Sequence, residues 1–342
     1  MKLAAVLAVS TMALAACGGG KSVSGDEGGD KKSLKVGLAY DIGGRGDKSF
    51  NDAAAAALDK VKSDLDLEVK DLSAKADEPP ADKEERLRLL ADGGYNPVVA
   101  VGFAYAPALT KVAKEFPNTK FGIVDGVVEG APNVTGMIFS EEQGSFLVGV
   151  AAALTTKKNN IGYIGGCLVP LLQKFEAGFT AGAKAVKPDI VVQVKYLSDP
   201  PKCPGFNETA GAKTTANGMY DKADIIYAAA GGSGAGVFEA AKAKNALVIG
   251  VDSDQYQTAD PAVRDVIMTS MLKRVDVAVF DFIKGVGEDK FAAGTKLFDL
   301  KVDGVGYSTS GGKVDGIKAK LDEYKQQIID GKITVPDKPA AS

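Results

Sequence analysis

Short, nearly continuous apolar runs alternate with amphipathic segments along most of this 342-residue chain. Apolar runs of this length, ended by glycine or aspartate, predict buried strands, and the apolar spacing between them is that of helices. Such an alternation predicts an α/β fold with parallel sheets that helices cover on both faces. The predicted strands are 34–40, 68–72, 97–102, 120–124, 160–165, 190–196, 225–229, 247–251 and 265–269, and the predicted helices are 49–65, 83–92, 106–116, 140–155, 174–186, 207–220, 234–244 and 275–285.

The strand–helix pattern runs once to Asp125 and then begins again, which predicts two similar lobes. Ligands of open parallel sheets bind beyond the carboxyl ends of the strands, so the residues at these ends are the candidates for function. Aspartate offers hydrogen-bond acceptors there, and glycine lets a ligand approach the backbone. The strand-end positions are Asp41, Gly102, Asp125, 165–166, 231–232, Asp252 and 269–273.

The first 33 residues have the pattern of a lipoprotein leader. A basic start precedes an apolar run that ends in Leu-Ala-Ala-Cys at 14–17, and this run is shorter than the roughly 20 residues that a membrane-spanning helix needs. The pattern predicts a signal peptide over 1–16, lipidation of Cys17 and a disordered tether over 17–33. The folded part is then extracytoplasmic and is held on the cell membrane through its lipid anchor only. The alternative is an ordinary secretory leader with a chance cysteine.

Composition excludes several classes of function. The net charge is −3 and no run of Lys or Arg marks a basic stripe, so no nucleic-acid partner is expected. Histidine is absent, which excludes Ser-His-Asp triads, Cys-His pairs and histidine-based metal sites. We therefore expect no catalytic residues, no metal and no cofactor.

Cys167 and Cys203 remain once Cys17 is assigned to lipid. In an oxidising exterior such a pair predicts a disulfide, and two separate buried thiols are the alternative. A zinc site is excluded because two cysteines and no histidine are too few ligands.

Five motifs at or beside the strand ends carry a family resemblance. Taken alone, the first of them has a plain structural interpretation, in which Ser49 caps the following helix and Phe50 packs on the sheet. Together and in this order, they resemble the Bmp family of substrate-binding lipoproteins, the purine-nucleoside receptor group that serves ABC transporters. The motifs are GDKSFN at 46–51, FGIVD at 121–125, FEAGFTAG at 175–182, AAGGSG at 229–234 and IGVDSDQ at 249–255.

The resemblance implies a type I periplasmic-binding-protein fold, with two Rossmann-like lobes joined by three crossings of the chain and a nucleoside in the cleft. The expected N-terminal lobe comprises 34–139 and 273–299, and the expected C-terminal lobe comprises 140–272 and 300–335. The segment PPKCP at 200–204 departs from the family's pattern.

The resemblance also implies contacts to the base. Phe50 and Phe175 correspond to a pair of rings that sandwich the base, while Asn51, Asp41 and Asp125 correspond to groups that hydrogen-bond its edge. Asp125 could instead cap the turn that follows it.

For the ribose, the resemblance implies Asp252 and Lys273 as partners of the hydroxyls, with Lys273 beside Asp252 and orienting it. Gly232 is expected to offer backbone polar groups. Phe179 competes with Phe175 for the stacking position, and Asp252 could also be a turn cap. Read as a phosphate-binding loop, 231–234 lacks the Gly-Lys-Ser/Thr ending of a P-loop.

The sequence thus predicts a monomeric, lipid-anchored receptor that captures a nucleoside, expected to be a purine nucleoside, and delivers it to an ABC permease. One alternative is a protein of the same fold that binds a sugar or another small polar ligand. Another is an extracellular nucleoside hydrolase, which would need clustered carboxylates with a metal or an acid–base pair. The predicted acidic strand ends are spread one per strand. A transcription factor is excluded by the leader and by the lack of an N-terminal DNA-binding segment.

Overall fold

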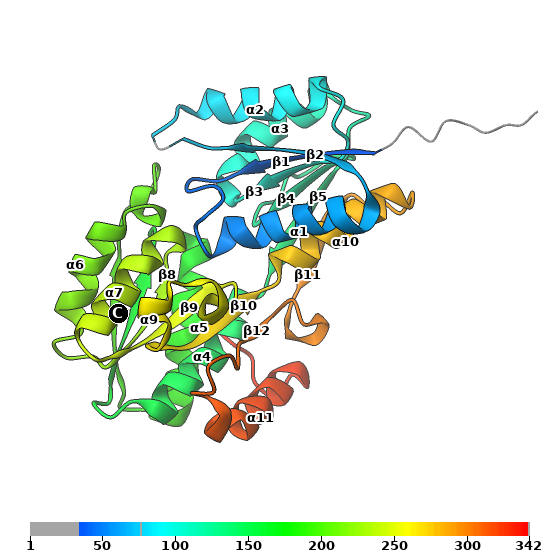
Figure 1. Cartoon of the computed structure of the whole chain (residues 1–342). Helices are drawn as coiled ribbons and strands as arrows, with labels where there is room; N and C mark the ends of the chain where they lie inside the picture. The colour runs from blue at the N-terminus through cyan, green and yellow to red at the C-terminus, as the bar shows by residue number, and fades with distance from the viewer. Residues whose placement is uncertain (1–33, 76, 341–342) are drawn as a thin grey trace, which may run out of the picture. The chain divides into compact units, whose positions relative to one another are not determined.

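A computed structural model of the protein describes residues 34–75 and 77–340. The predicted signal peptide, the lipidation site Cys17 and the tether lie outside the described residues. Those residues form two six-stranded sheets with helices around each (Figure 1). The predicted α/β class is confirmed.

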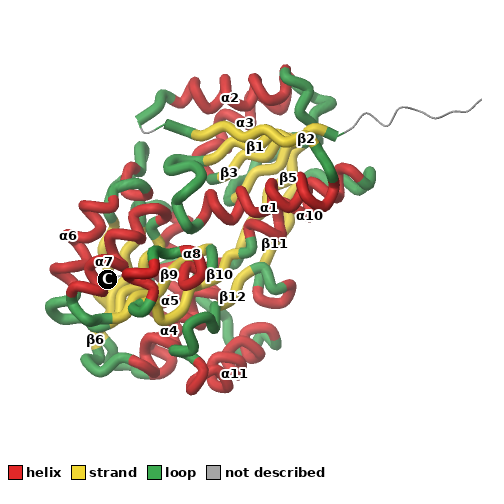
Figure 2. Tube along the Cα trace, in the orientation of Figure 1, coloured by secondary structure: helices red, strands yellow, loops and turns green. Residues whose placement is uncertain are grey.

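The first sheet is parallel throughout, with the strand order β11-β5-β4-β3-β1-β2. Helices α2 and α3 cover one face, and α1 and α10 cover the other (Figures 1 and 2). Its elements are β1 (Lys35–Tyr40), α1 (Phe50–Leu65), β2 (Glu68–Ser73), α2 (Pro80–Asp92), β3 (Val98–Val101), α3 (Ala106–Glu115), β4 (Phe121–Val124), β5 (Val134–Phe139), α10 (Val275–Gly287) and β11 (Gly294–Phe298).

The second sheet has the order β12-β10-β9-β8-β6-β7, and only the pairing of β12 with β10 is antiparallel among the strands described. Helices α4 and α5 pack together, as do α6 and α7, and α11 packs on α4. Its elements are α4 (Glu141–Thr155), β6 (Asn160–Gly165), α5 (Pro170–Val186), β7 (Val191–Tyr196), α6 (Thr209–Met219), β8 (Ile225–Ala229), α7 (Gly234–Ala243), β9 (Leu247–Asp252), α8 (Gln255–Thr258), α9 (Pro261–Arg264), β10 (Ile267–Lys273), β12 (Val305–Tyr307) and α11 (Lys318–Ile329).

The central strands explain why the apolar runs are continuous. In β1, Val36, Leu38, Ala39 and Tyr40 have no exposed surface, because helices cover both faces of the strand. The edge strand β2 has no such run, and half of its residues are exposed. The length of an apolar run therefore reports how central a strand is in its sheet.

The chain passes between the two sheets in three places: from β5 through α4 to β6, from β10 through α10 to β11, and from β11 to β12. Two of these connections contact each other. The rings of Phe139 and Phe298 stack with centroids 5.1 Å apart, and the amide of Ser140 donates to the Phe298 carbonyl at 3.1 Å. The lobe boundaries expected from the sequence stay a prediction.

Several elements differ from the sequence prediction. The strands β5, β11 and β12 and the helix α11 were not predicted. Helix α5 begins at Pro170 rather than residue 174, and α2 begins at Pro80 rather than residue 83. Both start with proline, which the first helical turn tolerates because its N–H groups have no intrahelical partner.

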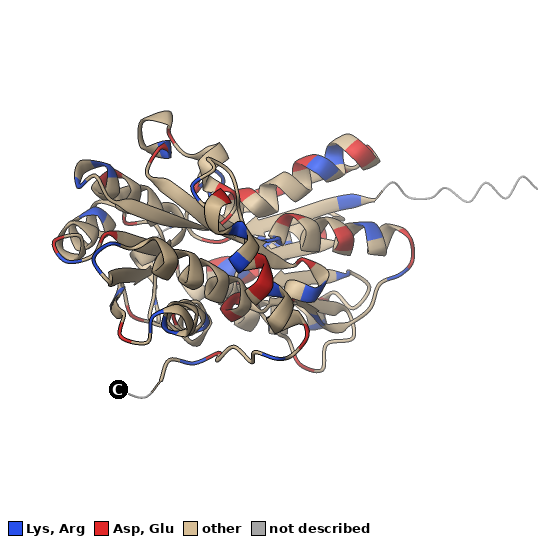
Figure 3. Cartoon of the chain, turned by 90° about the horizontal axis from the view of Figure 1, so that it is seen from below, with Lys and Arg blue, Asp and Glu red and all other residues tan. Residues whose placement is uncertain are grey.

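The exposed charges are mixed in sign. Lysine and arginine alternate with aspartate and glutamate along the helices in the view of Figure 3, and ion pairs such as Lys213–Glu239 and Lys242–Asp265 join neighbouring helices and turns. Across the part of the chain that is described, no helix combines the length and the apolar content that crossing a membrane requires.

Candidate functional site

The carboxyl ends of strands from both sheets line a single pocket, whose walls include Asp41, Phe50, Asn51, Asp125, Phe175, Gly232, Asp252 and Lys273. These are the eight ligand-binding residues that the family resemblance implied. The pocket has a cavity volume of about 70 Å³, several times the roughly 10–15 Å³ that one water molecule needs. The structure thus brings together residues that lie more than 200 positions apart in the sequence.

Two phenyl rings of the pocket wall lie close to the same ammonium group. Phe50 opens α1 and is partly buried, while Phe175 lies in the first half of α5 and is 3% exposed. The Nζ atom of Lys273 lies 5.3 Å from the centroid of the Phe50 ring and 5.5 Å from that of Phe175. Both distances are within cation–π range.

Phe179, which competed with Phe175 at the sequence level, does not line the pocket. It is fully buried, and its ring centroid lies 5.3 Å from that of Tyr227 and 6.5 Å from that of Tyr163. One helical turn separates Phe175 from Phe179, and this places one ring at the pocket and the other in the core of the second sheet.

The turn before α1 is organised by Asp47, not by Ser49. The Asp47 carboxylate accepts hydrogen bonds from the backbone amides of Ser49, Asn51 and Asp52 at 2.8–3.0 Å. The alternative interpretation, in which Ser49 caps the helix, is wrong, because its side chain makes no capping bond. Its hydroxyl instead donates to the Asp252 carboxylate at 2.6 Å, which joins the first sheet to the second.

Asn51 and Asp41 form a polar corner at the end of β1. The Asn51 side-chain oxygen accepts from the Asp41 amide at 3.1 Å, and its nitrogen donates to the Ile42 carbonyl at 3.2 Å and to Asp47 at 3.0 Å. Because both amide protons are engaged, Asn51 has only acceptor capacity left for a ligand. Burial raises the pKa of Asp41.

Gly102 makes room for this corner. A Cβ atom on Gly102 would lie 2.5 Å from the Asp41 Oδ2 atom, and the residue has a φ of 106°. Both the close approach and the positive φ require glycine. The sequence pointed to Gly102 as a strand end, and the structure adds its effect, which is to let β3 end against the Asp41 carboxylate.

Lys273 is the centre of a buried ionic cluster. Its Nζ atom lies 2.7 Å from Asp125 Oδ2 and 2.9 Å from Glu141 Oε1, and the three side chains are 1%, 4% and 1% exposed. Asp125 follows β4, Glu141 opens α4 and Lys273 ends β10. A second lysine, Lys174, reaches Glu141 Oε2 at 3.0 Å from outside the cluster.

These contacts differ from the expectation that Lys273 orients Asp252. In the strand register Leu272, not Lys273, is opposite Asp252. Lys273 lies one residue further along, and its ammonium reaches the ends of β4 and β5 in the other sheet. Asp252 takes its hydrogen bond from Ser49 instead, and Lys273 acts on it through the electrostatic field alone.

Burial and charge shift the acid–base properties of this cluster. Burial raises the pKa of Asp252 to about 6, although Lys273 and Ser49 act in the opposite direction. Burial also raises the pKa of Asp125, with nearby Glu141 acting in the same sense. For Lys273 burial acts to lower the pKa, but Asp125, Glu141 and Asp252 outweigh it, and the pKa is raised.

One acceptor in the pocket is unused. Among the described residues, Asp125 Oδ1 has no hydrogen-bond partner although the atom is buried. Buried carboxylate oxygens in proteins are almost always hydrogen-bonded, and an exception requires an explanation. Asp125 lines the pocket, so a donor on a bound molecule would satisfy it.

The second sheet supplies a glycine-rich wall opposite the start of α1. Gly231 and Gly232 follow β8, and a Cβ atom on Gly232 would lie 3.7 Å from the Cβ of Asp47. Ser253 and Gln255, which follow β9, also join the second sheet to the turn before α1. Their side chains donate to the carbonyls of Ser49 and Lys48 at 2.9 Å each.

Sequence reasoning missed two parts of this site. Glu141 was missed because the strand before it, β5, was not recognised. Other missed side chains lie between the predicted elements, where no periodic pattern marks them. The missed members of the pocket wall are Ile42, Phe103, Leu171, Leu172 and Phe206.

Comparison with known proteins gives concordant matches. The model of a family described as ABC transporter substrate-binding protein PnrA-like matches residues 34–339. The chain is 36% identical to the CD4+ T-cell-stimulating antigen of Listeria innocua, over 98% of this chain and 97% of that protein. It is 35% identical to the ABC transporter nucleoside-binding protein BmpA of Lactococcus lactis, over 97% and 99%.

A solved structure agrees with these matches. The crystal structure of ABC transporter system solute-binding proteins from Aeropyrum pernix K1 has a TM-score of 0.77 and 28% identity to this chain, over 89% of this chain and 94% of that one. The expected type I periplasmic-binding-protein fold is confirmed. The chain belongs to the Bmp family of PnrA-like ABC transporter substrate-binding proteins.

Proposed function

We propose that this protein captures a purine nucleoside in the pocket and delivers it to the permease of an ABC importer, as a monomer anchored on the outer face of the cell membrane through lipid on Cys17. The observation that carries the proposal is the combination, in one pocket, of two phenyl rings and an unpartnered buried acceptor, Asp125 Oδ1. A relative named as a nucleoside-binding protein shares 35% identity over nearly the whole chain.

The pocket's two kinds of wall suit the two halves of a nucleoside. A flat base between Phe50 and Phe175 gains about 1–3 kcal/mol from stacking, by analogy with bases on aromatic side chains in single-strand binding. The ribose carries hydroxyl donors, and the Asp252 carboxylate is an acceptor in the field of the positive charge on Lys273. The edge of the base carries donors such as the N1–H of inosine, for which Asp125 Oδ1 is an acceptor. A nucleoside is neutral overall and rich in hydroxyl and N–H donors, which suits a pocket wall whose charged residues are four aspartates and one lysine.

Delivery follows from a difference in affinity between two states. The hydrogen bonds from Ser49, Ser253 and Gln255 join the ends of the two sheets in the described state. A ligand that contacts both sheets favours this closed arrangement over one in which the sheets are apart, by its difference in affinity for the two. The permease is then expected to recognise the closed form.

Ligand-induced thermal stabilisation with a panel of compounds tests the proposal. The protein is first stripped of bound ligand by unfolding in guanidinium and refolding with its disulfide intact. Inosine, guanosine and adenosine are expected to raise the melting temperature increasingly as their concentration exceeds the Kd, and ribose and galactose are expected to leave it unchanged. Stabilisation by the sugars but by none of the nucleosides would overturn the proposal.

The same samples separate binding from catalysis. Substrate-binding proteins of ABC transporters are not enzymes, so inosine should be recovered intact after prolonged incubation. Release of free hypoxanthine in proportion to protein concentration would instead support a nucleoside hydrolase.

A further inference from the structure

Two side chains that follow β9 bond across to the turn before α1. The Ser253 hydroxyl donates to the Ser49 carbonyl, and the Gln255 side-chain amide donates to the Lys48 carbonyl, each at 2.9 Å. Within the described residues, neither Ser253 nor Gln255 belongs to the pocket wall. These two side chains therefore join the two sides of the pocket without being part of its lining.

Gln255 is fixed firmly on its own sheet. The residue is 2% exposed, its Oε1 atom accepts from the Val251 amide at 2.8 Å, and its own amide donates to the Ser270 hydroxyl at 3.1 Å. A Cβ atom on Gly250 would lie 2.6 Å from this Oε1 atom, so the close approach requires glycine. Because the Val251 N–H can only donate and the Lys48 carbonyl can only accept, Nε2 is the atom that points across.

The Lys48 carbonyl is available to this donor because α1 does not use it. Lys48 has a φ of 57°, in the left-handed region that residues other than glycine rarely adopt. The amide of Asp52, four residues further on, would pair with this carbonyl in a continuous helix, but it donates to Asp47 at 3.0 Å. A donor from the second sheet thus takes the place of an intrahelical bond.

The loop between β7 and α6 also contacts the other side, but this contact is weak. Lys202 in this loop reaches Asp77 at 3.4 Å, and both side chains are about 70% exposed. Exposed ion pairs contribute little to stability. This pair therefore provides a control for the two buried contacts made after β9.

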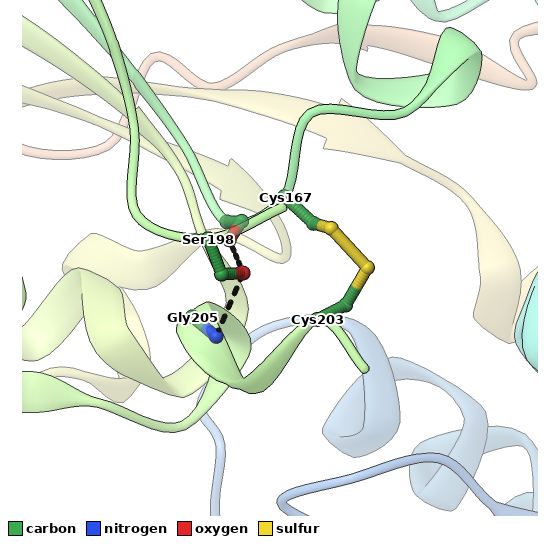
Figure 4. Close-up of a disulfide and its surroundings, with 5 residues drawn as sticks. Cys167, Ser198, Cys203 and Gly205 are labelled. Carbon is green, nitrogen blue, oxygen red and sulfur yellow. Dashed lines mark hydrogen bonds between the residues drawn. A yellow bond between two sulfur atoms is a disulfide. The ribbon is translucent and has the colours of Figure 1, made fainter. Parts of the chain in front are cut away.

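The strong bonds of the same loop stay within the second sheet's side of the pocket. Cys203 forms a disulfide with Cys167, and their Cα atoms are 5.2 Å apart. The Ser198 hydroxyl donates to the Gly166 carbonyl at 2.7 Å (Figure 4). Both bonds fasten the loop to the end of β6, so they are the same whether the two sheets are together or apart.

We propose that Ser253 and Gln255 form a latch that sets the affinity and the lifetime of the closed complex, while the pocket wall sets which ligand is bound. This inference rests on the proposed nucleoside function. The latch bonds exist only when the two sheets are together, so they favour the closed form by the same factor for every ligand. Opening breaks them before the ligand leaves, and they therefore slow dissociation without changing association.

Calorimetry with inosine, guanosine and adenosine tests the common factor. In Gln255→Met the affinity for each nucleoside should fall by about threefold to tenfold, since only the bond to Lys48 distinguishes the closed form from the open one. Ser253→Ala removes one partly buried hydroxyl and should cost about twofold to threefold, which keeps the test valid if Gln255→Met does not fold. Unchanged affinities, or factors that differ among the nucleosides, would overturn the latch.

The matched control is Lys202→Met, which removes the exposed contact between the two sides. Its affinity for each nucleoside should stay within about 1.5-fold of wild type. A loss as large as that in Gln255→Met would contradict the assignment of the latch to the residues after β9.

Stopped-flow kinetics separate a latch from a general loss of structure. In Ser253→Ala and Gln255→Met, the dissociation rate of inosine should rise by the factor by which the affinity falls. The association rate constant should stay within about 1.5-fold of wild type. Slower association with an unchanged dissociation rate would overturn the proposed latch.

A double-mutant cycle tests for an indirect effect through Asp252, which precedes Ser253 and is the proposed ribose acceptor. A latch acts independently of this acceptor, so Ser253→Ala should weaken inosine binding by the same factor in the Asp252→Asn background. Loss of the effect in that background would mean that Ser253 only positions Asp252, and would overturn the latch.

The outcomes distinguish this inference from the proposed function. Failure of wild type to bind any nucleoside would overturn both. Binding of inosine by wild type, with an affinity that is indifferent to Ser253 and Gln255, would overturn the inference and leave the proposed function standing.

Discussion

The protein has two clusters of buried charge that are built differently. One joins Glu78 to Lys83 and Arg86 at 2.9 and 2.5 Å on the flank of the sheet, and the Glu78 side chain is 1% exposed. The other joins Lys273 to Asp125 and Glu141 in the pocket. Both withdraw formal charges from solvent, which costs several kcal/mol per ion unless partners compensate.

The Glu78 cluster is complete. Its carboxylate accepts from Lys83, from both terminal nitrogens of Arg86 and from the Lys75 amide. Burial alone would raise the pKa of Glu78, but these hydrogen bonds outweigh it and lower the pKa to about 2. Arg86 also donates to the Tyr105 hydroxyl at 2.8 Å. Nothing in this cluster requires a further partner.

The Lys273 cluster is incomplete within the described residues, since Asp125 Oδ1 has no donor and burial raises the pKa of its carboxyl group. Perturbed carboxyl groups in a pocket are typical of functional sites. The comparison teaches that burial of charge does not by itself mark a site. A buried network in which every polar atom has a partner stabilises the fold. A buried network beside a cavity that leaves one acceptor without a donor can bind a ligand there.

The largest effect is expected from Lys273→Met. It removes the charge that compensates two buried carboxylates, and breaking such a cluster costs about 3–5 kcal/mol of stability. Inosine affinity should fall by at least about 100-fold, because the carboxylate acceptors for the ligand lose the charge that orients them. Calorimetry below the melting temperature measures this, and Lys174→Met is the matched control with a much smaller expected loss. Retention of wild-type affinity in Lys273→Met would remove the functional role of the cluster.

The Arg86→Met variant tests whether the two clusters have different roles. It should destabilise the protein by about 3–5 kcal/mol, because Glu78 loses its main partner, as measured by urea unfolding. Inosine affinity of the folded variant should stay within about twofold of wild type. A loss of affinity as large as that in Lys273→Met would show that the two clusters are not functionally distinct.

A smaller effect is expected from Phe50→Ala, which removes one of the two stacking rings. Loss of about 1–3 kcal/mol of stacking predicts a roughly tenfold weaker affinity for inosine. Phe50→Leu is the control for lost apolar contact without aromatic character. An unchanged affinity by calorimetry would place Phe50 in the core rather than in the binding site.

The pH dependence of binding is the smallest predicted effect. The folded pKa of Asp252, about 6, lies above its usual value of 3.8, so its contribution to the stability of the empty protein is present below pH 3.8 and is lost as pH rises through 6. A ribose hydroxyl that donates to this carboxylate requires the ionised form. Inosine affinity should therefore fall as pH decreases through 6, by up to about tenfold per pH unit.

Calorimetry between pH 8 and pH 5 measures this dependence, and Asp252→Asn serves as the control because it removes the titrating group. The glutamate of the complete cluster, with its pKa near 2, does not titrate in this range. A pH profile that is the same in wild type and Asp252→Asn would contradict the assignment of Asp252 to the ribose.

The sequence predicted which residues line the pocket better than it predicted the hydrogen bonds and ion pairs among them. Asp41, Asp125 and Asp252 could be found because a strand's end is visible in an apolar run, and parallel strands bring their ends to one edge. Glu141 could not be found, since β5 contains a glycine and lies in a segment with no long apolar run.

Contacts between distant segments also escaped prediction. The partner of Lys273 depends on how the two sheets face each other, which no local pattern encodes. Ser49 lies where an N-cap is expected, but its hydroxyl bonds to Asp252 across more than 200 residues. Phe206 lies in a proline-rich loop without periodicity, and only the cysteine pair pointed to that region.

The most direct test of this account is an experimental structure of the protein crystallised with inosine. The account predicts the base between the rings of Phe50 and Phe175, and a donor on the edge of the base within hydrogen-bond distance of Asp125 Oδ1. A base bound elsewhere, or an Asp125 Oδ1 atom that stays without a donor in the complex, would contradict it.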